Sequence, residues 1–132
     1  MKFVKILIPV VCIVMLMSLC VAGAAQVRYN NTVAPGTSIK VNPTTKKTGG
    51  QYATCMHNKT TPAGDNYFHF ACTNASKKRV SALKKVASSG LYSSKFNTGE
   101  NQSGKTYYMY AAAPSTNTGN IVINGYWSPD NW

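Results

Sequence analysis

The sequence has very few acidic residues: Asp65, Glu100 and Asp130 are the only ones among 132 residues. Each stands next to Gly, Asn or Pro in a turn-like stretch, so a pair of carboxylates arranged for glycoside hydrolysis has little support. The G-x-S-x-G and H-E-x-x-H signatures of hydrolases and metalloproteases are also missing. These absences predict a protein that is not an enzyme and needs no metal or cofactor.

The N-terminal 25 residues have the layout of a secretory signal peptide. Lys2 and Lys5 precede an apolar run over 6–21, and small residues follow at 22–25. We expect a signal-peptide helix in this segment, cleavage after Ala24 or Ala25, and a secreted, extracellular product. An uncleaved anchor is the alternative, since about 20 apolar residues can span a bilayer. Cleavage is favoured because small residues close the run and no Lys or Arg directly follows it.

Cysteine is limited to four residues, and two of them lie in the predicted signal peptide. In an oxidising compartment we expect the other two, Cys55 and Cys72, to form a disulfide worth roughly 3 kcal/mol. Zinc binding together with His57 and His69 is one alternative, and a Cys55–His57 nucleophile pair is another. If the two cysteine-bearing segments form a hairpin, Cys72 and His69 point to opposite faces, which disfavours the zinc site.

The composition after the predicted cleavage site favours strands and turns. Asn, Thr and Ser make up 35 of these 107 residues, and Gly and Pro recur too often to leave room for long helices. We therefore expect a single all-β domain over 26–132, a small antiparallel β-sandwich, Ig-like or jelly-roll-like, with room for one short helix. The predicted strands are 27–32, 38–41, 51–57, 66–73, 106–112 and 120–127, and 76–90 is a strand or a short helix.

Alternating side chains indicate how these strands face the core. Phe68, Phe70 and Cys72 share one face of their strand, which predicts the core side. We expect 106–112 to form a hairpin with 120–127.

The C-terminal stretch GNIVINGYWSPDNW also alternates with a period of two, which predicts a core strand that contains Trp127. Gly125 indicates either a bulge or a place where a large ring lies across the strand. Pro129 is expected to end the strand, because it has no amide hydrogen to donate. Beyond it the last residues are expected to trail away, and Trp132 is a candidate for an exposed aromatic contact.

The chain is strongly cationic, with 14 Lys and Arg and a net charge of +11. Loss of the signal peptide leaves twelve Lys and Arg against the three acidic residues. We expect the densest cluster to bind an anionic surface or polymer, with an affinity that falls as salt rises. The alternative is a solvated face that only keeps the protein soluble. The cluster consists of Lys77, Lys78, Arg79, Lys84 and Lys85.

Two stretches resemble a family of small secreted Bacillus proteins of unknown function. IVINGYWSPD is similar to the V-x-G-Y-W ending of that family, and KKRVSALKKVASSG is similar to its central R-V-S…V…G stretch. The resemblance implies a secreted β-sandwich and an extended conformation for the central stretch, but no activity. This chain differs in being more basic and in carrying Cys55 and Cys72. A weaker similarity to lactococcin-type bacteriocins rests on export, positive charge and an aromatic C-terminal end.

The function that we expect is that of a secreted, cationic, non-enzymatic β-sandwich protein that binds a cell-wall polymer or a membrane surface. Nucleic acid is a less favoured partner. One alternative is a bacteriocin-like, membrane-active antimicrobial protein, which requires Tyr126, Trp127 or Trp132 to be exposed beside the charge. Another is a structural or partner-binding surface protein, in which the charge is incidental.

Overall fold

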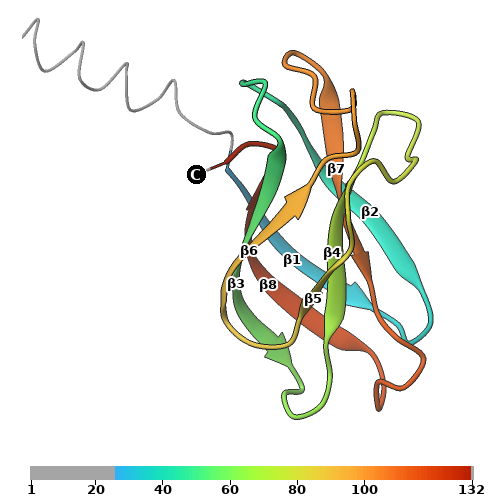
Figure 1. Ribbon diagram of the computed structural model, residues 1–132. Coiled ribbons are helices and arrows are strands. Elements are labelled where there is room, and N and C mark those ends of the chain that lie inside the picture. Colours follow the sequence, from blue (N-terminus) through green and yellow to red (C-terminus); the bar gives the residue numbers. More distant parts are fainter. Residues whose placement is uncertain (1–25, 132) are drawn as a thin grey trace, which may run out of the picture.

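A computed structural model of the protein describes residues 26–131, which form eight β-strands and no α-helix (Figure 1). The predicted signal peptide over 1–25 and Trp132 lie outside the described residues. Within 26–131, no helix is long and apolar enough to cross a membrane. The strands are β1 (Val27–Val33), β2 (Ser38–Thr45), β3 (Tyr52–Thr61), β4 (Phe68–Thr73), β5 (Lys84–Val86), β6 (Gly90–Lys95), β7 (Thr106–Ala112) and β8 (Ile121–Ser128).

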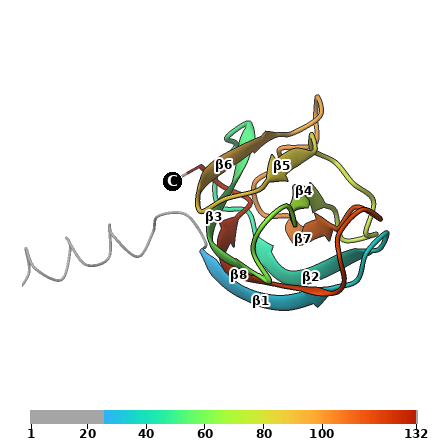
Figure 2. The same ribbon diagram turned by 90° about the horizontal axis from the view of Figure 1, so that it is seen from below.

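The strands form two antiparallel four-stranded sheets, as predicted for a β-sandwich. One sheet has the order β1-β8-β3-β6 and the other β2-β7-β4-β5. The pairing is nested: β1 pairs with β8, β2 with β7, β3 with β6 and β4 with β5. This is the arrangement of a jelly roll, the second of the two predicted architectures. Viewed along the strands, the layers approach each other at both edges, β1 beside β2 and β5 beside β6 (Figure 2).

The core lies between the sheets and is built from the alternating inward side chains of both. In β4 the predicted face is confirmed, since Phe68, Phe70 and Cys72 are fully buried. In β8, Trp127 is fully buried as well, so the C-terminal stretch is a core strand, as predicted. Its indole Nε1 donates to the Asn42 carbonyl oxygen at 3.0 Å. The apolar core residues are Tyr29, Val33, Ala53, Cys55, Phe68, Phe70, Cys72, Val80, Val86, Phe96, Tyr107, Met109, Ala111, Ala113, Ile121, Ile123 and Trp127.

The predicted hairpin of 106–112 with 120–127 is wrong, and the two cysteine-bearing segments form no hairpin either, because both connections cross from one sheet to the other. β3 and β4 lie in different sheets, and so do β7 and β8. Two consecutive strands can pair within one sheet or lie in the two facing sheets. In both cases each strand presents one apolar face to the same core. Alternation therefore predicts the strands correctly but does not predict which of them are neighbours.

The stretch 76–90 forms no helix. Val80 and Val86 are buried, but Leu83, which completes the apparent helical spacing, is 42% exposed. The stretch contains an isolated bridge between Ser81 and Phe96 and the three-residue strand β5. Strand β6 was not predicted at all: it lies at a sheet edge, and only Ser94 of its six residues is buried, so its sequence shows no core pattern.

Candidate functional site

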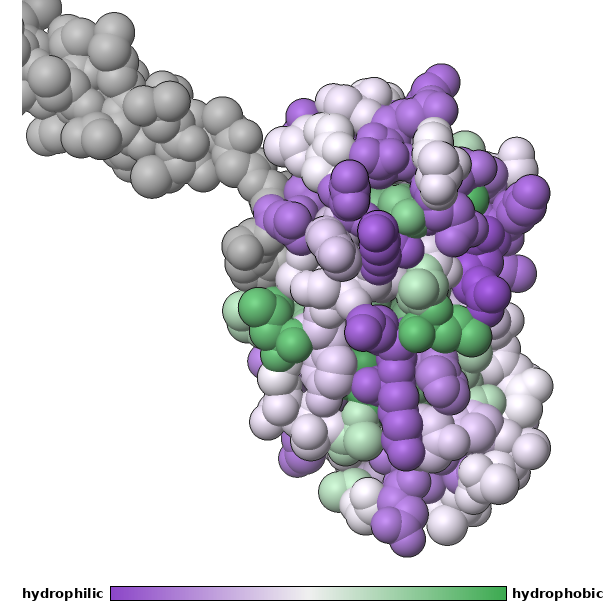
Figure 3. Space-filling view, in the orientation of Figure 1, coloured by the Kyte–Doolittle hydropathy of each residue, from purple (hydrophilic) through white to green (hydrophobic). Residues whose placement is uncertain are grey.

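The five cations of the predicted cluster are all exposed, but they do not share one face. Three lie in the β4–β5 loop and two in β5. Lys85 pairs with His69 on the outer side of its sheet, whereas Lys84 pairs with Phe70, whose side chain points into the core. Alternation therefore directs Lys84 to the opposite side of the strand, at the open edge between β5 and β6. Figure 3 looks onto this edge, where hydrophilic side chains run down the middle.

A group of aromatic side chains lies on the outer side of the β2-β7-β4-β5 sheet. Tyr108 and Tyr110 alternate with buried residues of β7, and their partners on β4 are Thr73 and Ala71. At the other end of β4, the rings of Tyr67 and His69 meet edge to face, with centroids 5.5 Å apart. All four ring-bearing side chains are half-buried. We call this surface the tyrosine face: Tyr67, His69, Tyr108 and Tyr110.

Lysines lie directly over two of these rings. The Lys85 ammonium is 4.3 Å from the centroid of Tyr67, and the Lys77 ammonium is 5.5 Å from that of Tyr108. Each contact contributes roughly 0.5–1 kcal/mol at an exposed site and orients the cation without neutralising it. Lys40 pairs with Tyr110 on the neighbouring strand and adds another positive charge. Of the predicted cluster, the structure thus brings Lys77 and Lys85 onto a common face with aromatic rings.

The tyrosine face runs between two hollows. Strand β7, which carries Tyr108 and Tyr110, has seven residues, so the face is about 20 Å long at 3.3–3.4 Å per residue. The hollow beside the β4–β5 and β6–β7 loops has a volume of about 230 Å³, and the one beside the β3–β4 and β7–β8 loops has about 380 Å³. The larger hollow is lined by Gly64, Asp65, Asn66, Tyr67, Lys85, Ala87 and Thr116.

One buried polar atom on this face has no partner. Thr73 Oγ1 is fully buried and makes no hydrogen bond within the described residues. Thr73 pairs with Tyr108 of β7 on one side, and on the other side it forms an isolated β-bridge with Arg79. Buried side-chain polar atoms are nearly always hydrogen-bonded, so an exception calls for an explanation. Because Thr73 is fully buried, this atom offers no contact to a ligand on the tyrosine face.

The fold also contains a buried polar cluster on the inner side of the other sheet. Tyr29 on β1 and His57 on β3 flank Gly125 of β8 in register. The Tyr29 hydroxyl is 2.7 Å from His57 Nδ1 and 3.3 Å from Cys55 Sγ, while His57 Nε2 is 2.8 Å from Thr60 Oγ1. Tyr29 is fully buried and His57 is 2% exposed, and His57 and Thr60 line a hollow of about 200 Å³ at the outer end of the cluster. We assign it to the stability of the fold.

His57 is expected to make the fold less stable at mildly acidic pH. Burial lowers its pKa from 6.5 to about 4. Below about pH 6.5, His57 binds a proton in the unfolded chain but stays neutral in the folded chain. The free energy of unfolding therefore drops by roughly 2–3 kcal/mol towards pH 4. Urea unfolding between pH 7 and pH 4 should show this drop. The drop should persist in His69→Gln and shrink in His57→Gln. An equal drop in both variants would mean that titratable groups other than His57 cause it.

The structure does not contain the predicted disulfide, since Cys55 and Cys72 are free thiols. They lie on facing sheets, on β3 and β4, and both side chains are fully buried. Cys55 Sγ contacts the Tyr29 hydroxyl instead. Burial raises the pKa of the Cys55 thiol to about 12, against the opposing effect of that hydrogen bond, and burial raises the pKa of Cys72 as well. Both groups are therefore uncharged, unreactive thiols in the folded chain.

The alternative zinc set, which was disfavoured, is not assembled either. His69 lies on the outer side of β4, whereas Cys72 points into the core, as alternation predicts. Among the described residues, no group of three or more His, Cys, Asp or Glu side chains could hold a metal ion.

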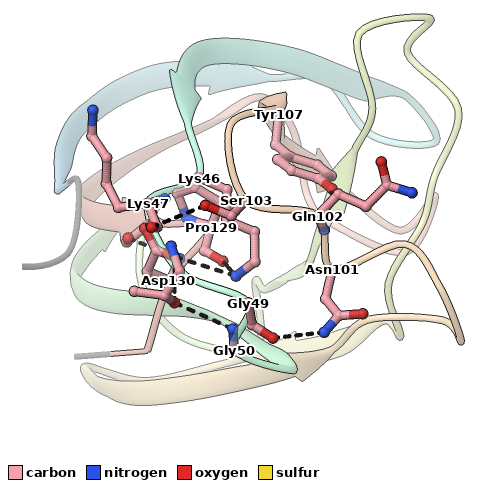
Figure 4. A network of polar contacts seen from close by, with 12 residues as sticks. Lys46, Lys47, Gly49, Gly50, Asn101, Gln102, Ser103, Tyr107, Pro129 and Asp130 are labelled. Carbon is pink, nitrogen blue, oxygen red and sulfur yellow. Dashed lines mark hydrogen bonds and ion pairs between the residues drawn. The ribbon is translucent and has the colours of Figure 1, made fainter.

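A buried ion pair holds the C-terminal end of the chain. Lys46 Nζ lies 3.3 Å from Asp130 Oδ1 and donates to the Pro129 carbonyl oxygen at 2.6 Å, with both charged side chains fully buried (Figure 4). Burial alone would raise the pKa of Asp130, but hydrogen bonds from the Lys47 and Thr48 amides and the Thr48 hydroxyl, together with Lys46, hold it below its usual value. The prediction that the last residues trail away is thus wrong up to Asp130. This ion pair holds Pro129 and Asp130 against the end of β2, and its charged groups are too deeply buried to bind a ligand.

Residues 99–106 contain a pattern that was not predicted: they read GENQSGKT, with the spacing of the phosphate-binding loop G-x-x-x-x-G-K-T. Such a loop binds phosphate with free backbone N–H groups and leads into a helix. Here it leads into strand β7, and several of its N–H groups are occupied. Those of Gln102 and Gly104 donate to the Tyr107 hydroxyl and the Lys46 carbonyl, and that of Lys105 to Gln102. The pattern therefore does not form a nucleotide site.

Tyr126 and Trp127 of the C-terminal end lie apart from the lysines of the tyrosine face. Trp127 is fully buried, and Tyr126, 39% exposed, lies on the other sheet, where its neighbours are Arg28 and Met56. Trp132 lies outside the described residues. A comparison of the chain with protein-family models, with curated proteins and with solved structures finds no match.

Proposed function

We propose that this chain is a secreted, non-enzymatic binding protein whose tyrosine face holds an anionic polymer of a cell surface. One observation carries this proposal: Lys77 and Lys85 are held over tyrosine rings on one sheet face and have no acidic partner. Within the described residues the only ion pair is the buried one between Lys46 and Asp130. The charge of these lysines is therefore free to attract an external anion. The resemblance to small secreted Bacillus proteins stays a prediction, and the proposed binding does not depend on it.

An extended polymer fits this face better than a small anion. Cations at Lys77, Lys40 and Lys85 are spread along about 20 Å of strand, with rings between them. Each charge binds one anionic group of the polymer, and the half-buried rings pack against the apolar parts between those groups. Affinity then comes from several weak contacts and falls as salt rises.

The membrane-active alternative has less support. Insertion into a bilayer by the aromatic C-terminal end requires its large aromatic side chains to be exposed beside the lysines. Trp127 is in the core, and the rings beside the lysines, Tyr67 and Tyr108, are half-buried in the sheet surface. A polymer that lies on the folded face needs no such insertion.

The test is to remove charge from the tyrosine face and, as a matched control, from the other sheet. We expect K77Q/K85Q to lower the affinity for isolated cell wall by about tenfold at 50 mM salt and to reduce the slope of log K against log salt. The control K59Q/K95Q makes the same change in net charge on β3 and β6, where both lysines are exposed. It should lower the affinity by about threefold or less. Binding is measured by co-sedimentation and fluorescence polarisation.

Other outcomes would contradict the proposal. Equal losses in the two double variants would mean that net charge alone attracts the protein. Binding of the wild-type protein to anionic vesicles with dye leakage, and not to cell wall, would support the membrane-active alternative. No binding to either would leave the charge incidental and favour a protein partner.

A further inference from the structure

A carboxylate lies at the end of the cationic tyrosine face. Asp65 lines the larger hollow, together with Tyr67 and Lys85. Its side chain is exposed and makes no ion pair or hydrogen bond within the described residues. If the face attracted only negative charge, Asp65 would weaken binding, because like charges repel. A ligand that also carries hydroxyl groups removes this conflict, because a carboxylate is a strong hydrogen-bond acceptor.

The loop that carries Asp65 is fixed at its neighbouring residue. The side-chain nitrogen of Asn66 donates to the Thr118 hydroxyl and to the Pro62 carbonyl oxygen, both at 3.2 Å. The side-chain oxygen of Asn66 accepts a hydrogen bond from the backbone amide of Thr118 at 3.1 Å. On the other side, the Asn117 side chain donates to the Tyr67 carbonyl at 2.9 Å and accepts from the Tyr67 amide at 3.3 Å. The β3–β4 and β7–β8 loops are therefore joined into one wall, and the hollow exists before any ligand binds.

The groups around the hollow differ in chemistry and converge on one space. Tyr67 offers an aromatic ring, Lys85 a cation over that ring, Asp65 an acceptor and Thr116 a hydroxyl. The volume, about 380 Å³, is within the range of small-molecule sites. A sugar ring with an acidic group matches this set, since its hydroxyls donate to a carboxylate and its acidic group pairs with an ammonium.

We infer that this hollow binds one sugar ring of an anionic glycan, with its hydroxyls on Asp65 and its acidic group on Lys85. The inference rests on the proposed function and narrows it: the polymer on the tyrosine face is an acidic glycan. A polyanion without hydroxyl groups, such as polyphosphate, gains nothing from Asp65 and is repelled by it.

The test compares how one substitution, D65N, changes the affinity for two kinds of polymer. D65N removes the charge of Asp65 and keeps its size. For acidic glycans, represented by polygalacturonate and hyaluronate, we expect the affinity of D65N to fall about tenfold, as hydrogen bonds to a charged acceptor are lost. For polyphosphate, we expect unchanged or up to about threefold tighter binding, because a repulsive charge is gone. The matched control is E100Q, which removes a charge beside the smaller hollow and should not weaken binding to either polymer.

Each result bears on the inference in a distinct way. Tighter binding of D65N to the glycans as well as to polyphosphate would overturn it, because Asp65 would then only repel, while the proposed function would stand. Wild-type binding to polyphosphate but to neither glycan would overturn it in the same way. Binding of the wild-type protein to none of the polymers would overturn both the inference and the proposed function. Circular dichroism of D65N excludes a folding defect as the cause of a loss.

Discussion

Replacement of Gly125 by alanine is expected to destabilise the folded protein by about 3 kcal/mol or more. A Cβ atom at this position would lie 2.5 Å from the Tyr29 hydroxyl oxygen and closer still to the Met56 carbonyl oxygen. The carbonyl belongs to β3 in the middle of its sheet, so it cannot move without disturbing the pairing of β3 with β8. Displacement of Tyr29 would also break its hydrogen bond to His57 in the core.

Gly119→Ala is the matched control for this effect. Gly119 lies just before β8, and a Cβ atom there would meet nothing within 4 Å. We expect this variant to unfold within about 0.5 kcal/mol of the wild type. Urea denaturation at pH 7 measures both. A loss below about 1 kcal/mol for Gly125→Ala would mean that the sheet opens easily to admit a methyl group, and would contradict the close packing of Tyr29 against the strand.

Gly125 also illustrates how far the sequence predicts local structure. A glycine in an alternating strand predicted either a bulge or a ring across the strand. The ring is confirmed as Tyr29, a residue almost a hundred positions earlier in the chain. The bulge is found in the neighbouring strand, between His57 and Lys59 of β3. The sequence thus identifies the special position, but the partner depends on strand order, which no local pattern contains.

Strand order also explains why the candidate site was only partly predicted. The basic cluster was found as a run of charge, but the run divides between two sides of β5 once the strand forms. Lys40, Tyr108 and Tyr110 join the face from strands β2 and β7, which are distant in sequence. The alternation of Tyr108 and Tyr110 was visible in the sequence, yet it does not say that lysines of another segment will cover the same side of the sheet.

Asp130 is the second residue whose replacement is expected to cost several kcal/mol. Asp130→Ala leaves the Lys46 ammonium buried without its counterion, and it removes the acceptor of the Lys47 and Thr48 amides. An uncompensated buried charge typically costs 3–5 kcal/mol, so we expect a loss of about 4 kcal/mol in the free energy of unfolding. The measurement is urea unfolding at pH 7.

Lys46→Met is expected to cost less, roughly 1–2 kcal/mol, although it breaks the same ion pair. Asp130 keeps three donors in this variant: the amides of Lys47 and Thr48 at 2.9 and 3.0 Å and the Thr48 hydroxyl at 2.9 Å. Methionine also retains the apolar stem that packs near Phe96, whose ring centroid is 4.8 Å from the Lys46 ammonium.

The order of the two losses tests how the tail is held. If the ion pair itself supplied the stability, removal of either partner would cost about the same, and the variants would be interchangeable. If the carboxylate is instead the acceptor around which the β2–β3 loop folds, Asp130→Ala must be the more damaging variant, and the double variant K46M/D130A should lose less than the sum of the single losses, since it leaves no buried cation. Equal single losses would contradict the second arrangement. The contacts of Asp130 with two consecutive backbone amides favour it, because these hydrogen bonds persist whether or not Lys46 is present.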